Sequence, residues 1–169
     1  LDLLNQCWDQ ETIPEMMKEA NVASLYKKGD TQNLANYRPI SLLNYTYIIL
    51  AAIIQKRMAS KLEPFLQKTQ YGFRPKHSTA QALYLARRIQ DIGEESGSPI
   101  NLVLLDWEKA FDKVDQKRMI EALSRLNIPE QILAMIKALY DNPKFRVVNG
   151  DEQSEYHVQE TGIRQGCPL

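Results

Sequence analysis

The sequence is poor in the residues that define specialised folds. Its 169 residues include 2 cysteines, 7 glycines and 8 prolines, and no heptad repeat runs through it. Collagen, a long coiled coil and a disulfide scaffold are therefore excluded. Because Cys7 and Cys167 lie at opposite ends and cannot form a zinc site by themselves, a reducing compartment is the expected environment.

Long hydrophobic runs are also missing. The longest, residues 47–54, is far below the roughly 20 residues that cross a bilayer, so no membrane span is expected. Hydrophobic residues make up 44% and charged residues 25% of the chain, which is typical of a globular protein with one core. The chain starts at Leu1 and stops directly after a Gly-Cys-Pro turn, so we expect a segment of a longer polypeptide.

No charge of one sign prevails, but the 21 basic and 21 acidic residues are unevenly distributed. Residues 55–88 carry eight basic side chains and one acid, a net charge of +7, whereas residues 91–160 carry 14 acids and 8 bases, a net charge of −6. A region that handles a polyanion beside a region that handles a metal ion would have this asymmetry. Two sets of solvated helices with opposite bias would have it as well, and charge alone favours that interpretation.

Hydrophobic periodicity predicts a mixture of helices and strands, and so an α+β fold. Helices are expected over residues 1–10, 47–62, 116–126 and 130–140, and after the N-cap Ser78. Strands are expected over residues 21–26, 37–43, 145–148 and 156–161, the last two joined by an Asn149-Gly150 loop. The most strand-like run is 100–105, whose unbroken apolar residues predict burial on both faces.

Asp106 directly follows this run. A carboxylate at the end of a doubly buried strand is costly unless a cation compensates its charge, and the backbone carbonyl of Trp107 offers a second hard oxygen. The position suggests a metal site, although spacing alone favours the simpler role of a helix N-cap. The motifs of other enzyme classes are missing. Glu108 stands where a phosphoaspartyl enzyme carries its second aspartate, and no P-loop or Ser-His-acid arrangement is present.

Four blocks of the sequence resemble the reverse transcriptases of non-LTR (LINE-type) retrotransposons. They are Asn-Tyr-Arg-Pro-Ile-Ser-Leu-Leu at residues 36–43, Gln-Tyr-Gly-Phe-Arg-Pro at 70–75 with Ser-Thr at 78–79, Leu-Asp-Trp-Glu-Lys-Ala-Phe-Asp at 105–112, and Gly-Ile-Arg-Gln-Gly-Cys-Pro-Leu at 162–169. Each block alone is moderately specific, whereas all four in this order and spacing are highly specific. The resemblance implies a partial right-hand polymerase fold, with a lead-in helical segment over residues 1–19, fingers over 20–95 and the first part of the palm over 96–169.

The resemblance also implies roles for individual residues. Asp106 matches the catalytic, metal-binding aspartate of the first palm block, with the Trp107 carbonyl as its neighbouring ligand. The residues expected at the nucleotide are Lys27 and Arg38 on the triphosphate, Phe111 against a 2′-hydroxyl, and Gln165 and Gly166 beside template and primer. Arg74 falls in a block that helps to hold the template, and the basic run adds Lys56, Arg57 and Lys61 as candidate nucleic-acid contacts.

Without the resemblance, these residues have simpler interpretations. Phe111 could pack in a core, and Gln165-Gly166 could be a plain turn. Lys27, Arg38 and Arg74 could be turn, loop or surface charges.

The implied function is RNA-directed DNA polymerisation by two-metal nucleotidyl transfer. The parent would add dNTPs to a DNA primer on an RNA template in the cytoplasm and nucleus, with Mg²⁺ or Mn²⁺ as cofactor. The family's aromatic-Ala-Asp-Asp block does not occur in residues 1–169, and Asp112 and Asp115 are expected to face solvent, so the isolated chain is predicted to be inactive. The alternative is a non-catalytic relic or domesticated fragment that binds nucleic acid through its basic region. The oligomeric state is left open.

Overall fold

The chain divides into two units in the computed structural model, which describes all residues from 1 to 169. The first unit contains residues 1–62 and 109–169, and the second contains residues 63–108. The first unit therefore joins two stretches that the whole second unit separates in sequence.

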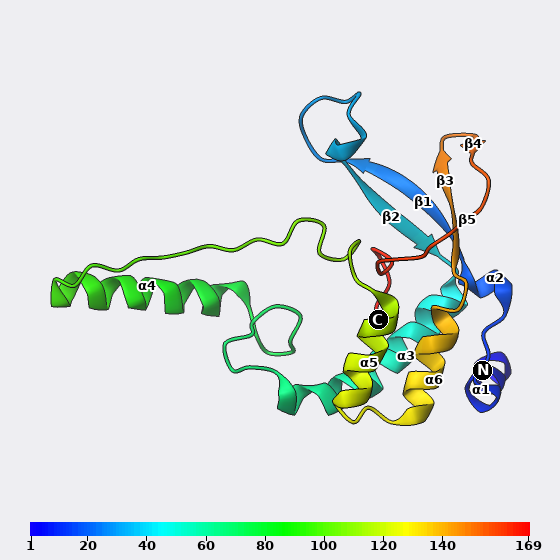
Figure 1. Ribbon diagram of the computed structural model, residues 1–169, viewed down its shortest axis with the longest axis horizontal. Coiled ribbons are helices and arrows are strands. Elements are labelled where there is room, and N and C mark those ends of the chain that lie inside the picture. Colours follow the sequence, from blue (N-terminus) through cyan, green and yellow to red (C-terminus); the bar gives the residue numbers. More distant parts are fainter. The chain divides into compact units, whose positions relative to one another are not determined.

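Five strands of the first unit form one sheet in the order β2-β1-β3-β4, with β5 paired to β3. β1 (Glu19–Tyr26) pairs antiparallel with β2 (Tyr37–Leu43) and parallel with β3 (Lys144–Asn149). The short strands β4 (Glu152–Gln153) and β5 (His157–Val158) run antiparallel to β3. β2 is preceded by the short helix η1 (Leu34–Asn36) and lies at the edge of the sheet, so its outer side is available to another segment (Figure 1).

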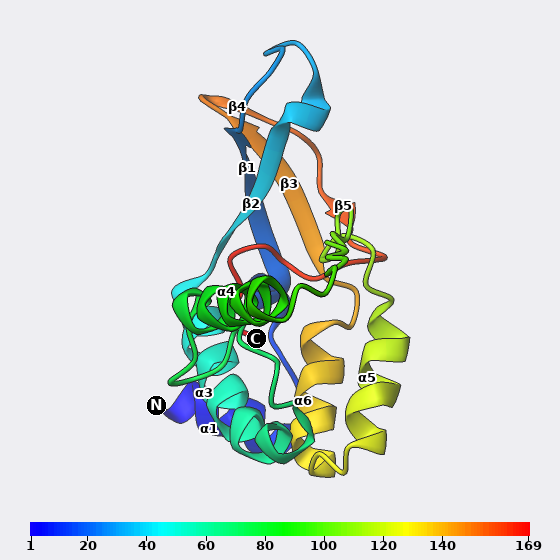
Figure 2. The same cartoon turned by 90° about the vertical axis from the view of Figure 1, so that its left-hand side faces the viewer.

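The helices of the first unit share one core. They are α1 (Asp2–Gln10), α2 (Glu15–Lys18), α3 (Tyr45–Leu62), α5 (Gln116–Arg125) and α6 (Glu130–Leu139), and Figure 2 shows α5 beside α6. Apolar residues at spacings of three and four turn one face of α3 and one face of α6 inward. The largest fully buried side chains are Met17, Tyr47, Leu50, Ile54, Leu133, Met135, Ile136 and Leu139.

The second unit contains one long helix, α4 (Thr79–Ser96), after the short helix η2 (Glu63–Phe65). Ser78 caps α4 as predicted, and its backbone N–H donates to Oε1 of Gln81 at 2.9 Å. The apolar face of α4, which carries Ala82, Leu85, Ala86 and Ile89, lines a cavity of about 250 Å³ together with Ile100 and Leu102. The helix thus contacts the start of the extended segment that follows it.

The strand predicted over residues 100–105 is absent, and this prediction is wrong. The segment is irregular, and Leu104 and Leu105 are exposed. A strand needs a hydrogen-bonded neighbour, and every strand of the sheet belongs to the other unit. The strand predicted over 156–161 is likewise reduced to β5, which shares one side of β3 with β4.

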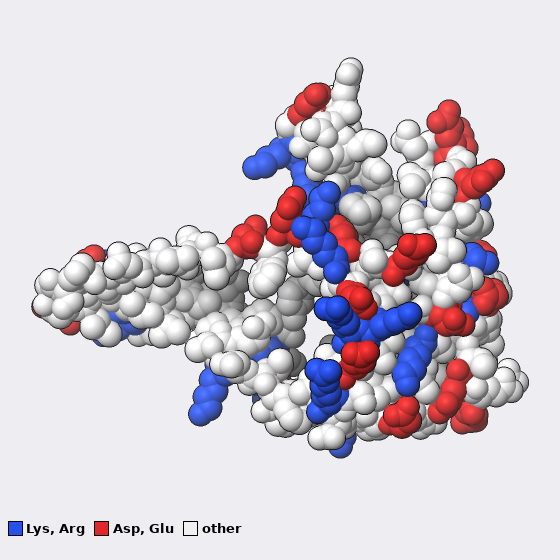
Figure 3. All heavy atoms as spheres, in the orientation of Figure 1, with Lys and Arg blue, Asp and Glu red and all other residues white.

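Helix hydrophobicity and surface charge indicate which kinds of partner the chain could contact. None of the helices combines the length and the apolar character that crossing a lipid bilayer requires. On the first unit, basic and acidic side chains lie intermixed in the view of Figure 3. A polyanion would therefore find local groups of basic side chains on this face, not one broad positive field.

Candidate active site

The fourth block forms a loop, residues 162–167, that joins the 111–114 segment to the strand β2 of the first unit. Its Gly162 N–H donates to the carbonyl of Val114 at 2.8 Å, and its Ile163 N–H donates to the carbonyl of Phe111 at 3.0 Å. On the other side, the carbonyl of Gln165 accepts the Ser41 N–H of β2 at 2.8 Å. The loop therefore occupies the open edge of the sheet and holds the end of the third block against it.

Gln165 also reaches the third block through its side chain. Its Nε2 donates to Oδ1 of Asp112 at 3.1 Å, so the predicted nucleotide residue is tied to the segment that carries Phe111. The expectation that Asp112 faces solvent is wrong, because this residue is only partly exposed and binds Gln165. Asp115 is exposed, and its Oδ1 caps α5 by accepting the Arg118 N–H at 3.0 Å.

Two glycines allow this close approach. Gly166 has φ +114°, and a Cβ at this position would lie 2.9 Å from the carbonyl oxygen of Ser41. Gly162 has φ +77°, and its Cβ would lie 2.8 Å from the carbonyl oxygen of Asp112. Because both neighbours are backbone atoms, no side-chain rotation could make room. The close contact between the loop and β2 therefore requires glycine at position 166.

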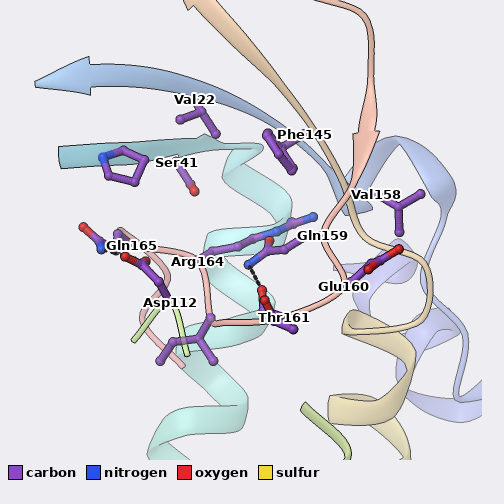
Figure 4. Close-up of a pocket in the computed structure, with 12 residues that line it drawn as sticks. Val22, Ser41, Asp112, Phe145, Val158, Gln159, Glu160, Thr161, Arg164 and Gln165 are labelled. Atoms are coloured by element: carbon purple, nitrogen blue, oxygen red, sulfur yellow. Dashed lines mark hydrogen bonds between the residues drawn. The ribbon is translucent and has the colours of Figure 1, made fainter. Parts of the chain in front are cut away.

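A cavity of about 420 Å³ lies beside this loop, on the face of the sheet that carries Val22 and Ser41 (Figure 4). Figure 4 shows Gln165 and Asp112 at one end of the cavity and Val158 with Glu160 at the other. An apolar floor with a few convergent polar groups is the usual composition of a small-molecule pocket.

Lys27 and Arg38 lie on the β1–β2 hairpin. Arg38 is exposed and pairs in register with Leu25, and the Lys27 N–H donates to the carbonyl of Asn36 at 2.8 Å. Since side chains alternate along a strand, Arg38 lies on the sheet face opposite Ser41 and the cavity. Ser41, where the loop is anchored, is three positions after Arg38 on β2, a distance of roughly 10 Å along the strand.

Asp106 and Trp107 lie in the second unit, on the segment after α4, and both are exposed. A carboxylate and a main-chain carbonyl are the hard oxygen donors that Mg²⁺ prefers. However, no group of three or more His, Cys, Asp or Glu side chains in either unit is placed to hold a metal ion. Asp106 and the Trp107 carbonyl are donors of the right type, but the burial expected to make the Asp106 charge costly is absent, so their metal role stays a prediction.

Arg74 closes the loop between η2 and α4. Its Nη1 donates to the carbonyls of Gln67 at 2.8 Å and Gln70 at 3.1 Å, and its Nη2 binds the carboxylate of Glu63. The Arg74 guanidinium lowers the pKa of that carboxyl below its ordinary value. The side chain is thus engaged within its own loop, so any effect on a template would act through the shape of that loop.

The three basic residues predicted on α3 differ in their surroundings. The Arg57 guanidinium lies over the Trp8 ring, 4.3 Å from its centroid, in a cation–π contact with α1. Lys56 and Lys61 are exposed on the same helix. The two lysines are therefore the better candidates for contact with phosphates.

Arg164 was not among the predicted site residues, although it stands inside the fourth block. It is only 4% exposed, and its Cζ lies 5.3 Å from the centroid of the Tyr47 ring. Burial raises the pKa of the Tyr47 hydroxyl, which lies 3.4 Å from Sγ of Cys167 at the end of the same loop. Arg164 and Asp112 were missed because a single sequence does not identify partners that are distant along the chain.

Comparison with known proteins identifies the family of this chain. The family model described as reverse transcriptase (RNA-dependent DNA polymerase) matches residues 26–169. An uncharacterized 149 kDa protein of transposon TX1 from Xenopus laevis is 29% identical over 99% of this chain. The Pol polyprotein of type-1 retrotransposable element R2 from Popillia japonica is 31% identical over 93%, and the RNA-directed DNA polymerase of mobile element jockey from Drosophila melanogaster is 26% identical over 99%.

This chain spans only a small part of these relatives, namely 13% of the TX1 protein, 18% of the jockey polymerase and 22% of the R2 polyprotein. The family match nevertheless covers all four blocks, from the hairpin with Arg38 to the loop with Gln165. The predicted resemblance is confirmed: the chain belongs to the reverse transcriptase family and is related to the enzymes of non-LTR retrotransposons.

Proposed function

We propose that this chain is the nucleotide-binding part of an RNA-directed DNA polymerase, made of fingers (residues 20–95) and the first part of the palm (96–169). The observation that carries the proposal is the docking of the 162–167 loop. Its hydrogen bonds to Phe111 and Ser41 bring together three blocks of the reverse transcriptase family. The parent protein would then copy an RNA template by adding dNTPs to a DNA primer.

The proposed roles follow from the chemistry of each side chain. Arg38 presents a planar fork that suits bidentate contact with a triphosphate, whereas Lys27 acts as a point charge directly after β1. Because Arg38 lies on the sheet face opposite the cavity, its contact with the triphosphate is proposed outside that cavity. Phe111 would exclude a 2′-hydroxyl by its bulk. Gln165 and Gly166 would shape the pocket next to the base pair being formed, with Gln165 held by Asp112.

Asp106 and the Trp107 carbonyl would contribute ligands to a divalent metal, Mg²⁺ or Mn²⁺, completed by carboxylates from outside these 169 residues. A metal ion held there would supply Lewis-acid activation of the primer hydroxyl and neutralise charge on the leaving group. Since neither unit contains a complete metal-binding group, we expect no primer extension by residues 1–169 alone. Robust nucleotide incorporation by the isolated chain would contradict this part of the proposal.

The decisive experiment replaces Asp106 in the full-length parent protein. Asp106→Asn keeps the side-chain shape and removes the charge, so primer extension should fall by at least about 100-fold while template affinity stays within about twofold. Asp151→Asn, the same change in the exposed turn before β4, is the matched control and should leave synthesis unchanged. Retained synthesis in Asp106→Asn would refute the metal role, and a wild-type parent that binds RNA without synthesis would favour the non-catalytic relic.

A further inference from the structure

Arg164 is one of two buried charged residues in the chain, the other being Lys18. Its guanidinium is not paired with a carboxylate. Nη2 binds the carbonyl of Lys18 and lies 3.4 Å from the carbonyl of Lys144, while Nη1 is buried without a partner. Burying a cation that neutralises no acid costs free energy, so the contacts of Arg164 must offset that cost.

The two carbonyls identify what Arg164 holds. Lys18 is the last residue of α2, immediately before β1, and Lys144 is the first residue of β3. β1 and β3 are parallel neighbours, so both carbonyls lie at the same end of the sheet. The Arg164 guanidinium also lies over the ring of Tyr47, which belongs to α3. One side chain therefore fastens the 162–167 loop to the end of α2, the start of β3 and the helix α3.

The residues on either side of Arg164 hold the loop beside the cavity of about 420 Å³, which is the candidate nucleotide pocket. Ile163, one residue before it, holds the carbonyl of Phe111, and Gln165, one residue after it, binds Ser41 and Asp112. Any displacement of Arg164 therefore moves both contacts together. Small misplacements of groups around a reacting centre reduce activity strongly even when the displaced residue does not touch the substrate.

We propose that Arg164, which also lines the cavity of about 420 Å³, is a positioning residue that fixes the 162–167 loop and so sets the pocket for the incoming nucleotide. The inference rests on the proposed polymerase function. Both carbonyls face one nitrogen, Nη2, so a lysine ammonium could replace part of this contact, but it would lack the planar guanidinium that lies against the Tyr47 ring. Because Arg164 acts on Phe111 and Gln165, its loss should affect nucleotide affinity and sugar selection more than the chemical step.

The test compares Arg164→Met with Lys18→Met in the full-length parent. Both changes remove a buried cation, but the Lys18 side chain binds Glu15 and Asp141, and its substitution keeps the carbonyl that Arg164 contacts. In Arg164→Met, KM for dNTP should rise about tenfold with kcat within about threefold, and the preference for dNTP over rNTP should fall at least about threefold. Arg164→Lys should restore part of both losses.

Lys18→Met should lower the unfolding temperature while leaving KM and sugar preference at wild-type values. If Arg164→Met and Arg164→Lys both keep wild-type KM and sugar preference, Arg164 is merely structural and the inference is wrong. Should Arg164→Met fail to fold, Arg164→Lys decides alone, with an expected rise in KM of about threefold. A wild-type parent that incorporates no dNTP would instead refute the proposed function, and the role of Arg164 with it.

Discussion

Phe111 is the residue whose predicted role can be separated most cleanly from stability. It is 46% exposed, and its backbone carbonyl, not its ring, accepts the hydrogen bond from Ile163. Phe111→Ala in the parent should therefore keep the loop docked while removing the bulk expected to exclude a 2′-hydroxyl. Incorporation of rNTP relative to dNTP should rise at least about tenfold, measured as the ratio of the two kcat/KM values.

Phe65→Ala is a suitable control, because this phenylalanine is similarly exposed, at 53%, but lies in η2. It should leave the ratio of rNTP to dNTP incorporation at its wild-type value. Unchanged sugar discrimination in Phe111→Ala would show that the aromatic ring is not the gate, whatever the effect on overall rate.

At the scale of elements, the docked loop depends on the backbone of Gly166. Gly166→Ala places a methyl group against the Ser41 carbonyl and requires an unfavourable positive φ, so we expect a loss of about 1–3 kcal/mol in the free energy of unfolding. Chemical denaturation measures this loss, and KM for dNTP should rise in the same variant. Gly150→Ala separates strain from collision, because Gly150 also has positive φ, +60°, but no atom lies within 4 Å of its Cβ position.

A loss in Gly166→Ala no larger than that in Gly150→Ala would mean that the loop yields easily at Ser41. In that case the edge of β2 would not hold the pocket, and the docking of the 162–167 loop would have little influence on nucleotide binding. A larger loss accompanied by an unchanged KM would instead separate the stability of the loop from nucleotide binding.

The elements that sequence predicts well are those with a local signal. The helices α3 and α6 show apolar residues at helical spacing, and the residue before Pro39 favours the extended backbone of β2. The segment 100–105 has an equally clear apolar signal, yet it forms no strand, because pairing requires a neighbour and composition does not supply one. Strand formation is in this sense a property of the surroundings.

The same distinction applies to the candidate site. Gln165 and Gly166 are identifiable because they belong to a motif, and the structure docks both on β2. Asp112 and Arg164 are not, because their roles come from contacts with residues far away in sequence. The partner of Asp112 is 53 positions distant, and the Lys18 carbonyl is 146 positions from Arg164.

At the scale of the whole molecule, the basic stretch 55–88 does not form one structural element. Its first residues lie on α3 in the first unit, whereas Arg74, Arg87 and Arg88 lie in the second. Arg74 binds Glu63, and Arg87 and Arg88 both pair with Asp91. A net charge counted along the sequence therefore overstates the number of cations available to a polyanion.

Lys56 and Lys61 remain available for phosphates, and their effect can be measured on the isolated chain. The double change Lys56→Glu with Lys61→Glu should weaken RNA binding about tenfold at low salt and much less at high salt, because fewer counterions are released. Lys117→Glu with Arg118→Glu reverses the same charge on α5 and should change affinity less than twofold. Fluorescence anisotropy across a salt series measures the RNA affinity of both double variants. Equal losses of affinity in the two would mean that RNA responds to overall charge and not to the surface of α3.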